Sequence, residues 1–439
     1  MVQMSAADVR GAINDRPMSP FQIAVVALCV IINMLDGFDV LVMSFAASSV
    51  SEEWQLSPGD LGLLLSSGLV GMAIGSMWMA PYGDRVGRRL LVLGCLAIVT
   101  VGMLCSSQAA DKHQLAAFRF ITGLGIGGML ATLNTMVSEF SSGARRGLCI
   151  SVLQSAYPLG AILGGIVSVY LLGEFGWRSL FLFGGLASLC MLPLAYWKLP
   201  ESLDFLLSKD RDGTLLEINR LTEKMRLPRV DRVDSAADDA PSAGLKVLLE
   251  NPYRRSSALI WSAFFCLMFG FYYVVSWTPK LLVDAGLTTA QGISAGIYLQ
   301  LGGIVGALSL GLLTARYPVA RLTPLYLLMS VVSMLVFGIA DLALPSLMLC
   351  AAVMGFFLIG AMIGLYTIAP SLYPVSHRVT GMGWAIGIGR LGAIVSPLMG
   401  GMLLVWGFSA GQSMLVFALP LLLAALAIFN IHSEAPPNQ

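Results

Sequence analysis

The chain has 439 residues, of which 57% are hydrophobic and 12% are charged, whereas an ordinary soluble protein has roughly 25% charged residues. This composition excludes a water-soluble fold of this size. Because one helical crossing of a bilayer takes about 20 mostly apolar residues, the length leaves room for about twelve spans. The formal net charge of +1 provides no basic surface for nucleic acid, so nucleic-acid binding is not expected.

Metal ions and nucleotide cofactors are not expected either. The three histidines and seven cysteines are scattered singly, without the spacing of a metal site or a disulfide framework. The glycine-rich runs lie inside apolar segments rather than after a strand, so they indicate close helix packing and not a nucleotide loop. We therefore expect no cofactor and no enzymatic site.

The apolar runs between charged residues and Gly or Pro breaks predict an all-α membrane protein. Its twelve spans are expected at 21–46, 58–82, 89–108, 115–140, 148–172, 177–198, 256–283, 290–314, 322–340, 345–370, 378–404 and 410–431. One long polar insertion, with a disordered-looking stretch at 235–239, divides the spans into six plus six. The predicted parts are an N-terminal tail at 1–20, a bundle at 21–198, a linker at 199–255, a second bundle at 256–431 and a tail at 432–439.

Basic residues are distributed unequally between the two sides of the membrane. One side holds Arg85, Arg88, Arg89, Arg145, Arg146, Arg316, Arg321, Arg378 and the basic residues of the linker. The other side holds only Lys112, Arg178 and Lys280, so the positive-inside rule predicts that both termini and the linker are cytoplasmic.

The two halves also resemble each other in sequence. Leu159-Gly160-Ala161-Ile162 in the fifth span recurs as Leu391-Gly392-Ala393-Ile394 in the eleventh span, 232 positions later. This repetition predicts two pseudo-symmetric six-helix halves. Duplicated halves of this kind place a binding site near the middle of the bilayer, between the halves, and open it to one side at a time.

Three ionisable residues in the first and fourth spans form one candidate site: Asp36, Asp39 and Arg119. An ionisable group in hydrocarbon costs at least ~2.5–3.5 kcal/mol, so each needs a partner or a water-filled cavity. We expect Asp36 and Asp39 in the outer half of the first span, on adjacent parts of one helical face. Two such carboxylates cannot both ionise cheaply, and beside Arg119 the pair can take up and release a proton. The alternative is a static buried ion pair that only fixes helix packing.

Arg390 is the fourth ionisable residue well inside a span, close to mid-bilayer in the eleventh. The preceding spans of the same half offer it no acidic partner, and its fork of donors suits a carboxylate. We therefore interpret it as the binding group for a substrate anion. The alternative is that Arg390 bonds backbone carbonyls across a helix break at Gly387, Gly389 and Gly392.

Aromatic residues near these charges are candidates for contact with a substrate. Most aromatics in spans serve packing or the interfacial belt, but the run 271–273 corresponds in the second half to Phe38-Asp39-Val40 in the first. The candidate substrate-binding residues are Tyr157, Phe271, Tyr272, Tyr273, Trp277, Tyr366 and Trp384, together with Arg390.

Several motifs resemble those of the major facilitator superfamily. The loop Gly83-Asp84-Arg85-Val86-Gly87-Arg88-Arg89 resembles its signature between spans two and three, and Arg119 with the glycines that follow resembles its fourth-span motif. Leu35-Asp36-Gly37-Phe38-Asp39 and Gly389-Arg390-Leu391-Gly392-Ala393 are similar to elements of the aromatic acid:proton symporters within it. The resemblance implies that Asp36 and Asp39 are required for transport and that Asp39 and Arg119 carry proton coupling.

A cytoplasmic gate is expected around the first of these motifs. Asp84 can cap a helix N-terminus of the other half, and the arginines can pair with Glu139 and with carbonyl ends of helices. The alternative for Arg88 and Arg89 is that they are present only because cytoplasmic loops are rich in basic residues. The candidate gate residues are Gly83, Asp84, Arg85, Gly87, Arg88, Arg89, Glu139 and Arg145.

The resemblance implies a monomeric symporter of a bacterial inner membrane that imports an aromatic carboxylate, such as benzoate or hydroxybenzoate, with protons. Its partners are then the small organic acid, protons and the lipid bilayer. Import or export of another small organic anion, a dienoic diacid or a drug is the alternative in the same architecture. A third possibility is a membrane sensor with a transporter fold.

Overall fold

A computed structural model describes residues 6–207, 214–227, 230, 248–250, 253–340, 342–373 and 377–432. Within this part of the chain, twelve helices are long and apolar enough to cross a membrane, as the sequence predicts. The predicted disordered stretch at 235–239 lies outside the described residues.

The first six long helices form one bundle. They are α2 (Pro20–Glu53), α3 (Pro58–Trp78), α5 (Arg88–Ser107), α6 (Lys112–Phe140), α7 (Arg146–Phe175) and α8 (Arg178–Lys198). The second bundle comprises α12 (Arg254–Asp284), α13 (Thr289–Leu313), α14 (Val319–Ile339), α15 (Leu344–Ser371), α16 (Arg378–Val405) and α17 (Ala410–His432). The short helices are α1 (Ala6–Asp15), η1 (Ala80–Tyr82), α4 (Gly83–Val86), α9 (Leu203–Leu207) and α10 (Thr214–Lys224).

The same pairs of helices pack in each bundle, which confirms the predicted pseudo-symmetry. In the first bundle α2 packs on α7, α3 on α6, and α5 on α8. The corresponding pairs in the second bundle are α12 with α16, α13 with α15, and α14 with α17. Between the bundles, α3 contacts α16, α7 contacts α13, and α2 contacts α12.

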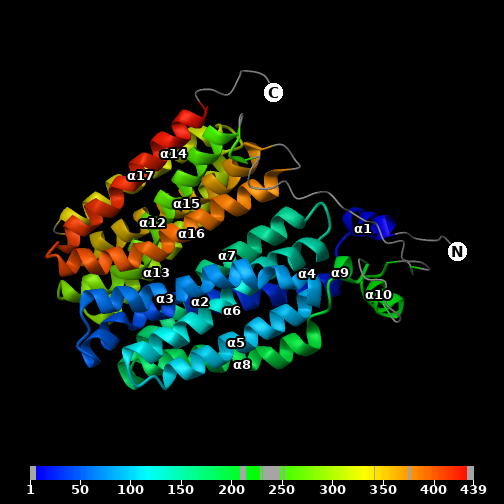
Figure 1. Cartoon of the computed structure of the whole chain (residues 1–439), viewed down its shortest axis with the longest axis horizontal. Helices are drawn as coiled ribbons and strands as arrows, with labels where there is room; N and C mark the ends of the chain where they lie inside the picture. The colour runs from blue at the N-terminus through cyan, green and yellow to red at the C-terminus, as the bar shows by residue number, and fades with distance from the viewer. Residues whose placement is uncertain are drawn as a thin grey trace.

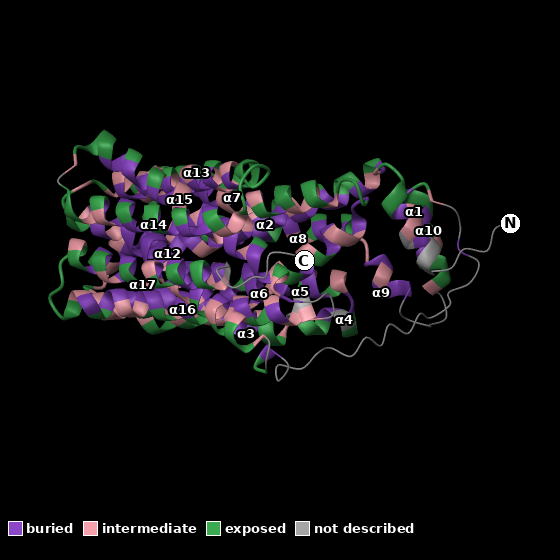
Figure 2. Ribbon diagram, turned by 90° about the horizontal axis from the view of Figure 1, so that it is seen from above, coloured by how far each residue is buried: buried purple, intermediate pink, exposed green. Residues whose placement is uncertain are grey.

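The side of the molecule on which α2 begins and α17 ends is called the termini side, and the opposite side the far side. The bundles lie together at the far side and diverge toward the termini side (Figure 1). Helices α1, α9 and α10 lie beyond the termini-side end of the first bundle (Figure 2).

Helix α2 is longer than predicted and this changes the depth of its two acids. The predicted span ends at residue 46, but the helix continues to Glu53. Its polar last turns are held at the far side, where Glu53 accepts hydrogen bonds from Trp177 Nε1 at 2.7 Å and from Arg178 Nη1 at 2.8 Å. At about 1.5 Å per residue, Asp36 and Asp39 therefore lie near the middle of the helix, further from its far-side end than a span that ends at residue 46 would place them.

Glycine allows α2 and α7 to pack with their backbones in contact. A Cβ atom on Gly37 would lie 2.0 Å from the carbonyl oxygen of Tyr157, and one on Gly160 would lie 1.8 Å from that of Met34. Real side chains do not fit at such distances, so both positions require glycine. This close approach brings Tyr157 of α7 to the level of Asp36 on α2.

Candidate functional site

The two acids of α2 are buried with few or no hydrogen-bond partners. Asp36 and Asp39 are each 1% exposed. Within the described part of the chain, both carboxyl oxygens of Asp39 and Oδ2 of Asp36 have no hydrogen-bond partner. A buried carboxyl group without partners is costly to ionise. These acids are therefore suited to a function that changes their protonation rather than to a permanent structural role.

Arg119 lies beside Asp39 but binds its backbone. Arg119 Nη2 donates to the main-chain carbonyl oxygen of Asp39 at 2.6 Å, and Nη1 donates to Met103 Sδ at 3.3 Å. Its guanidinium also lies over the Phe181 ring, 5.8 Å from the centroid. The two charges still interact electrostatically. Arg119 thus accompanies Asp39 as predicted, but among the described residues no ion pair within 4.0 Å joins it to a carboxylate.

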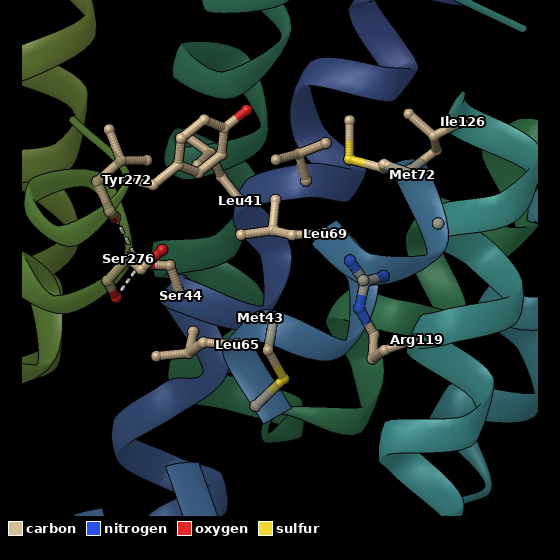
Figure 3. Close-up of a pocket in the computed structure, with 14 residues that line it drawn as sticks. Leu41, Met43, Ser44, Leu65, Leu69, Met72, Arg119, Ile126, Tyr272 and Ser276 are labelled. Atoms are coloured by element: carbon tan, nitrogen blue, oxygen red, sulfur yellow. Dashed lines mark hydrogen bonds between the residues drawn. The ribbon is translucent and has the colours of Figure 1, made fainter. Parts of the chain in front are cut away.

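A cavity connects Arg119 to the second bundle. It lies between α2, α3 and α6 on one side and α12 on the other, with Met43, Leu65, Leu69 and Met72 in its walls. Figure 3 shows the Arg119 guanidinium at one end and Tyr272 with Ser276 at the other. Arg119 therefore faces the interface between the halves and is not enclosed within its own bundle.

The bundles are joined on the far side of this cavity by contacts that we call the far-side seal. The Ser44 hydroxyl donates to the carbonyl oxygens of Val275 and Ser276 at 2.9 and 2.8 Å (Figure 3). The Ser66 hydroxyl donates to the carbonyl oxygen of Ile394 at 2.9 Å. In the third contact, Ile297 of α13 packs against Gly165 of α7. A Cβ atom placed on Gly165 would lie only 2.8 Å from Ile297 Cγ1.

The charge of Arg390 lies near three tyrosines from three different helices, and we call these four residues the tyrosine–arginine cluster. This charge interacts electrostatically with the phenol groups of Tyr157 on α7, Tyr272 on α12 and Tyr366 on α15. Tyr157 also interacts with the charge of Asp36. The cluster therefore spans both bundles, and Tyr157 connects it to the acids of α2. A guanidinium near phenol groups offers an anion a charge, hydroxyl donors and aromatic faces.

Phe271 adjoins this cluster, since its ring meets that of Tyr272 edge to face with the centroids 5.4 Å apart. Tyr273 and Trp277, two other predicted substrate-binding residues, do not adjoin it, because they lie on a different face of α12. The Tyr273 ring stacks on Phe417 of α17 at 3.8 Å between centroids, and Trp277 Nε1 donates to the Pro397 carbonyl oxygen at 3.1 Å. Both side chains fill the interior of the second bundle.

Trp384 also lies apart from the cluster. It is 41% exposed, and its ring lies against Trp261, 6.1 Å away between centroids. Trp261 and Ile388 line an apolar groove between α12, α16 and α17. Since six residues of an α-helix correspond to about 120° of net rotation, Trp384 and Arg390 point in different directions from α16.

Several predicted gate residues form a network at the termini side of the first bundle. Arg88 Nη2 lies 3.4 Å from Glu139 Oε1, and Arg88 Nη1 donates to Ser202 Oγ at 3.2 Å. The Ser202 hydroxyl in turn donates to Glu139. The main-chain N–H of Arg89 donates to Glu201 Oε1 at 3.1 Å. The network therefore ties α5 and α6 to the chain that follows α8.

The remaining gate candidates have diverse surroundings. Gly87 adopts a φ of +106°, and a Cβ there would lie 2.4 Å from Glu201 Oε2. The Arg85 guanidinium lies 5.8 Å from the centroid of the Tyr82 ring, and Gly83 begins α4. Arg145 is exposed at the start of α7. The side chain of Asp84 lies outside the described ones, and so does its expected cap on the other half.

Three residues that stand out in this geometry were not among the predicted site residues. Glu201 and Ser202 complete the network of Arg88 and Arg89. Gln300 on α13 is 2% exposed and its Oε1 has no hydrogen-bond partner among the described residues. The signal for Gln300 was an amide in the middle of an apolar span, which a search for ionisable groups passes over.

Comparison with known proteins places this geometry in a family context. The model of the Major Facilitator Superfamily matches residues 27–346. A gallate transporter of Pseudomonas putida is 32% identical over 97% of this chain and 96% of its own length. The 4-hydroxybenzoate transporter PcaK of Pseudomonas aeruginosa is 30% identical over 96% of this chain and 95% of its own. Among solved structures, the inward open conformation of the xylose transporter XylE from E. coli has a TM-score of 0.76 at 17% identity, over 95% of this chain and 98% of that one.

Proposed function

This chain belongs to the Major Facilitator Superfamily and is a transport protein rather than an enzyme, and from that premise we propose that it imports an aromatic carboxylate together with protons. The observation that carries this proposal is the tyrosine–arginine cluster, in which the charge of Arg390 on α16 lies near Tyr157 of α7, Tyr272 of α12 and Tyr366 of α15. The guanidinium binds the carboxylate and the phenols contact the ring and the carboxylate oxygens. Relatives named as transporters of gallate and 4-hydroxybenzoate support this substrate class.

Proton coupling is assigned to Asp36 and Asp39, with Arg119. Their burial and lack of hydrogen-bond partners support this role, because neutralisation by a proton removes the cost of a buried charge. Since Tyr157 interacts with both Asp36 and Arg390, the proton site and the anion site are adjacent. A proton and a carboxylate bound together leave the loaded protein closer to neutral, which favours movement of the halves through the bilayer.

The termini side is assigned to the cytoplasm of a bacterial inner membrane, because the basic residues concentrate there. The far-side seal then closes the periplasmic side, and the divergence of the bundles (Figure 1) corresponds to an inward-facing state. The network of Arg88, Glu139 and Ser202 belongs to the machinery of the cytoplasmic side. One chain contributes both halves of the site, which supports a monomeric transporter.

The test is uptake of labelled 4-hydroxybenzoate by proteoliposomes with an imposed acid-outside gradient, with and without an uncoupler. We expect accumulation that the uncoupler abolishes. Because a hydrogen bond to a charged group contributes about 1.5–3 kcal/mol, Arg390→Ala should raise the half-saturation concentration about 10- to 150-fold. The control is Arg321→Ala, an exposed arginine in the first turn of α14. Unchanged affinity in Arg390→Ala would refute the assignment of the carboxylate site.

A further inference from the structure

Gln300 has a buried acceptor without a partner in the described part of the chain. The side chain is 2% exposed, in the interior of α13, and within the described part of the chain Oε1 has no hydrogen-bond partner. Buried polar atoms in folded proteins nearly always have a partner, and one left without it costs about 1–3 kcal/mol. Such an atom requires an explanation, and a bound ligand that donates to it is one.

The side chain of Gln300 lies on the face of α13 that is turned toward the first bundle. Two residues one turn away define this face. A Cβ on Gly296 would contact Phe45 of α2 at 3.5 Å, and Ile297 contacts Gly165 of α7. Gln300 follows these residues by four and three positions, which in an α-helix places it on the same face.

Gln300 also lies at the same level as the substrate-binding residues. On α13 it is one turn from Ile297 of the far-side seal, toward the termini side. Tyr272 is one turn from Ser276 on α12, and Arg390 is one turn from Ile394 on α16, in the same direction. Gln300, Tyr272 and Arg390 therefore each lie one helical turn inside a contact of the far-side seal, on three helices of the second bundle.

The chemistry of these three residues is complementary to a substituted ring. Arg390 supplies a cation for the carboxylate, Tyr272 supplies an aromatic face, and Gln300 supplies an acceptor that only a donor can satisfy. Resting on the proposed function, we propose that Gln300 determines specificity: its Oε1 accepts a hydrogen bond from a hydroxyl group on the ring of the aromatic acid. The protein then prefers acids with a ring hydroxyl over those without one, because an apolar ring substituent leaves Oε1 buried and unpaired.

The first test compares substrates on the wild-type protein. Half-saturation concentrations are measured for benzoate, 4-hydroxybenzoate and 3-hydroxybenzoate, and for the two methoxy analogues, which keep the ring oxygen but cannot donate. We expect at least one hydroxybenzoate to bind about 10- to 100-fold more tightly than its methoxy analogue. Equal affinity within both hydroxy–methoxy pairs would overturn the role of Gln300. Absence of uptake of every acid would instead overturn the proposed function, so the two failures are distinguishable.

The second test uses Gln300→Met, which keeps the length of the side chain and removes the amide. We expect weaker binding of the preferred hydroxybenzoate by about 10- to 100-fold, with benzoate unchanged, so that the hydroxyl preference is lost. A uniform change for all acids, or none, would contradict the proposal. If this variant is absent from the membrane, Gln300→Asn is measured in its place. Asn keeps the amide but is shorter by one methylene group, so we expect the same selective loss of hydroxybenzoate affinity.

The matched control is Thr278→Val on α12. Thr278 is also buried, and its Oγ1 likewise has no hydrogen-bond partner among the described residues. It lies beyond Ser276 on the far side of the seal, whereas the substrate-binding residues lie inside the seal. Removal of this oxygen should leave the ratio of hydroxybenzoate to benzoate affinity unchanged. A selective loss in Thr278→Val would show that removal of any buried polar group alters selectivity, and would overturn the assignment to Gln300.

Discussion

The far-side seal gives a prediction for the balance between the states of the transporter. Ser44 donates to two carbonyl oxygens of α12 across the interface between the halves, at 2.9 and 2.8 Å. These hydrogen bonds exist only while the far side is closed. The hydroxyl has one proton, which the two carbonyl oxygens share. Since one hydrogen bond contributes about 0.5–1.5 kcal/mol net, Ser44→Ala should disfavour the sealed state by about 0.5–1.5 kcal/mol, which corresponds to about a 2- to 13-fold change in population.

The measurement is the distance distribution between spin labels at Gln55 and Phe408, in the far-side loops of the two halves, by pulsed electron paramagnetic resonance. We expect the short-distance population to decrease in Ser44→Ala. Ser66→Ala, which removes the bond to Ile394, should act in the same direction. The control is Ser67→Ala, whose hydroxyl donates to Leu64 within its own helix at 2.7 Å. Equal distributions in Ser44→Ala and Ser67→Ala would refute the reasoning.

Two further predictions concern the acids and the packing of α2. Asp39→Asn keeps the shape of the side chain. In proteoliposomes it should abolish gradient-driven accumulation of substrate but retain exchange of labelled for unlabelled substrate. If this variant still accumulates substrate with normal proton influx, Asp39 has no role in proton coupling. Gly160→Ala places a Cβ against the carbonyl oxygen of Met34 and should lower the unfolding temperature of the purified protein, since overpacking costs about 1–3 kcal/mol. Gly173→Ala on the same helix, with no atom within 4 Å of its Cβ, should not; equal shifts would contradict this.

The twelve spans and the two-half architecture could be predicted because hydrophobicity, charge asymmetry and internal repetition are properties of the sequence itself. The helix ends were less accessible. The last turns of α2 are polar and do not look like a membrane span, but contacts with Trp177 and Arg178 keep Glu53 helical at the far side. Such tertiary contacts are invisible to a reading of apolar runs.

The orientation of side chains around a helix was the second limit. Tyr272 and Tyr273 are neighbours in sequence, yet one faces the interface cavity and the other packs on Phe417. Successive residues of a helix point about 100° apart, so a run of aromatics cannot all face one site. The direction of each depends on how α12 packs against α2, α16 and α17, which only the folded structure provides.

The partner of Arg119 was the third limit. A charge beside a carboxylate suggests an ion pair, but here the guanidinium donates to the main-chain carbonyl oxygen of Asp39. Every residue carries such an oxygen, so composition and spacing contain no signal for this contact. The position of Arg119 near Asp39 could be predicted from depth, whereas the atom that it binds could not.

Tyr157 lies electrostatically between Asp36 of the proposed proton site and Arg390 of the proposed anion site. Thermodynamic reciprocity requires that if bound anion tightens proton binding by some factor, bound proton tightens anion binding by the same factor. Removal of the Tyr157 phenol would therefore weaken by the same factor the effect of bound anion on proton affinity and the effect of bound proton on anion affinity. We expect such a protein to be uncoupled, so that it transports the proton or the anion without the other.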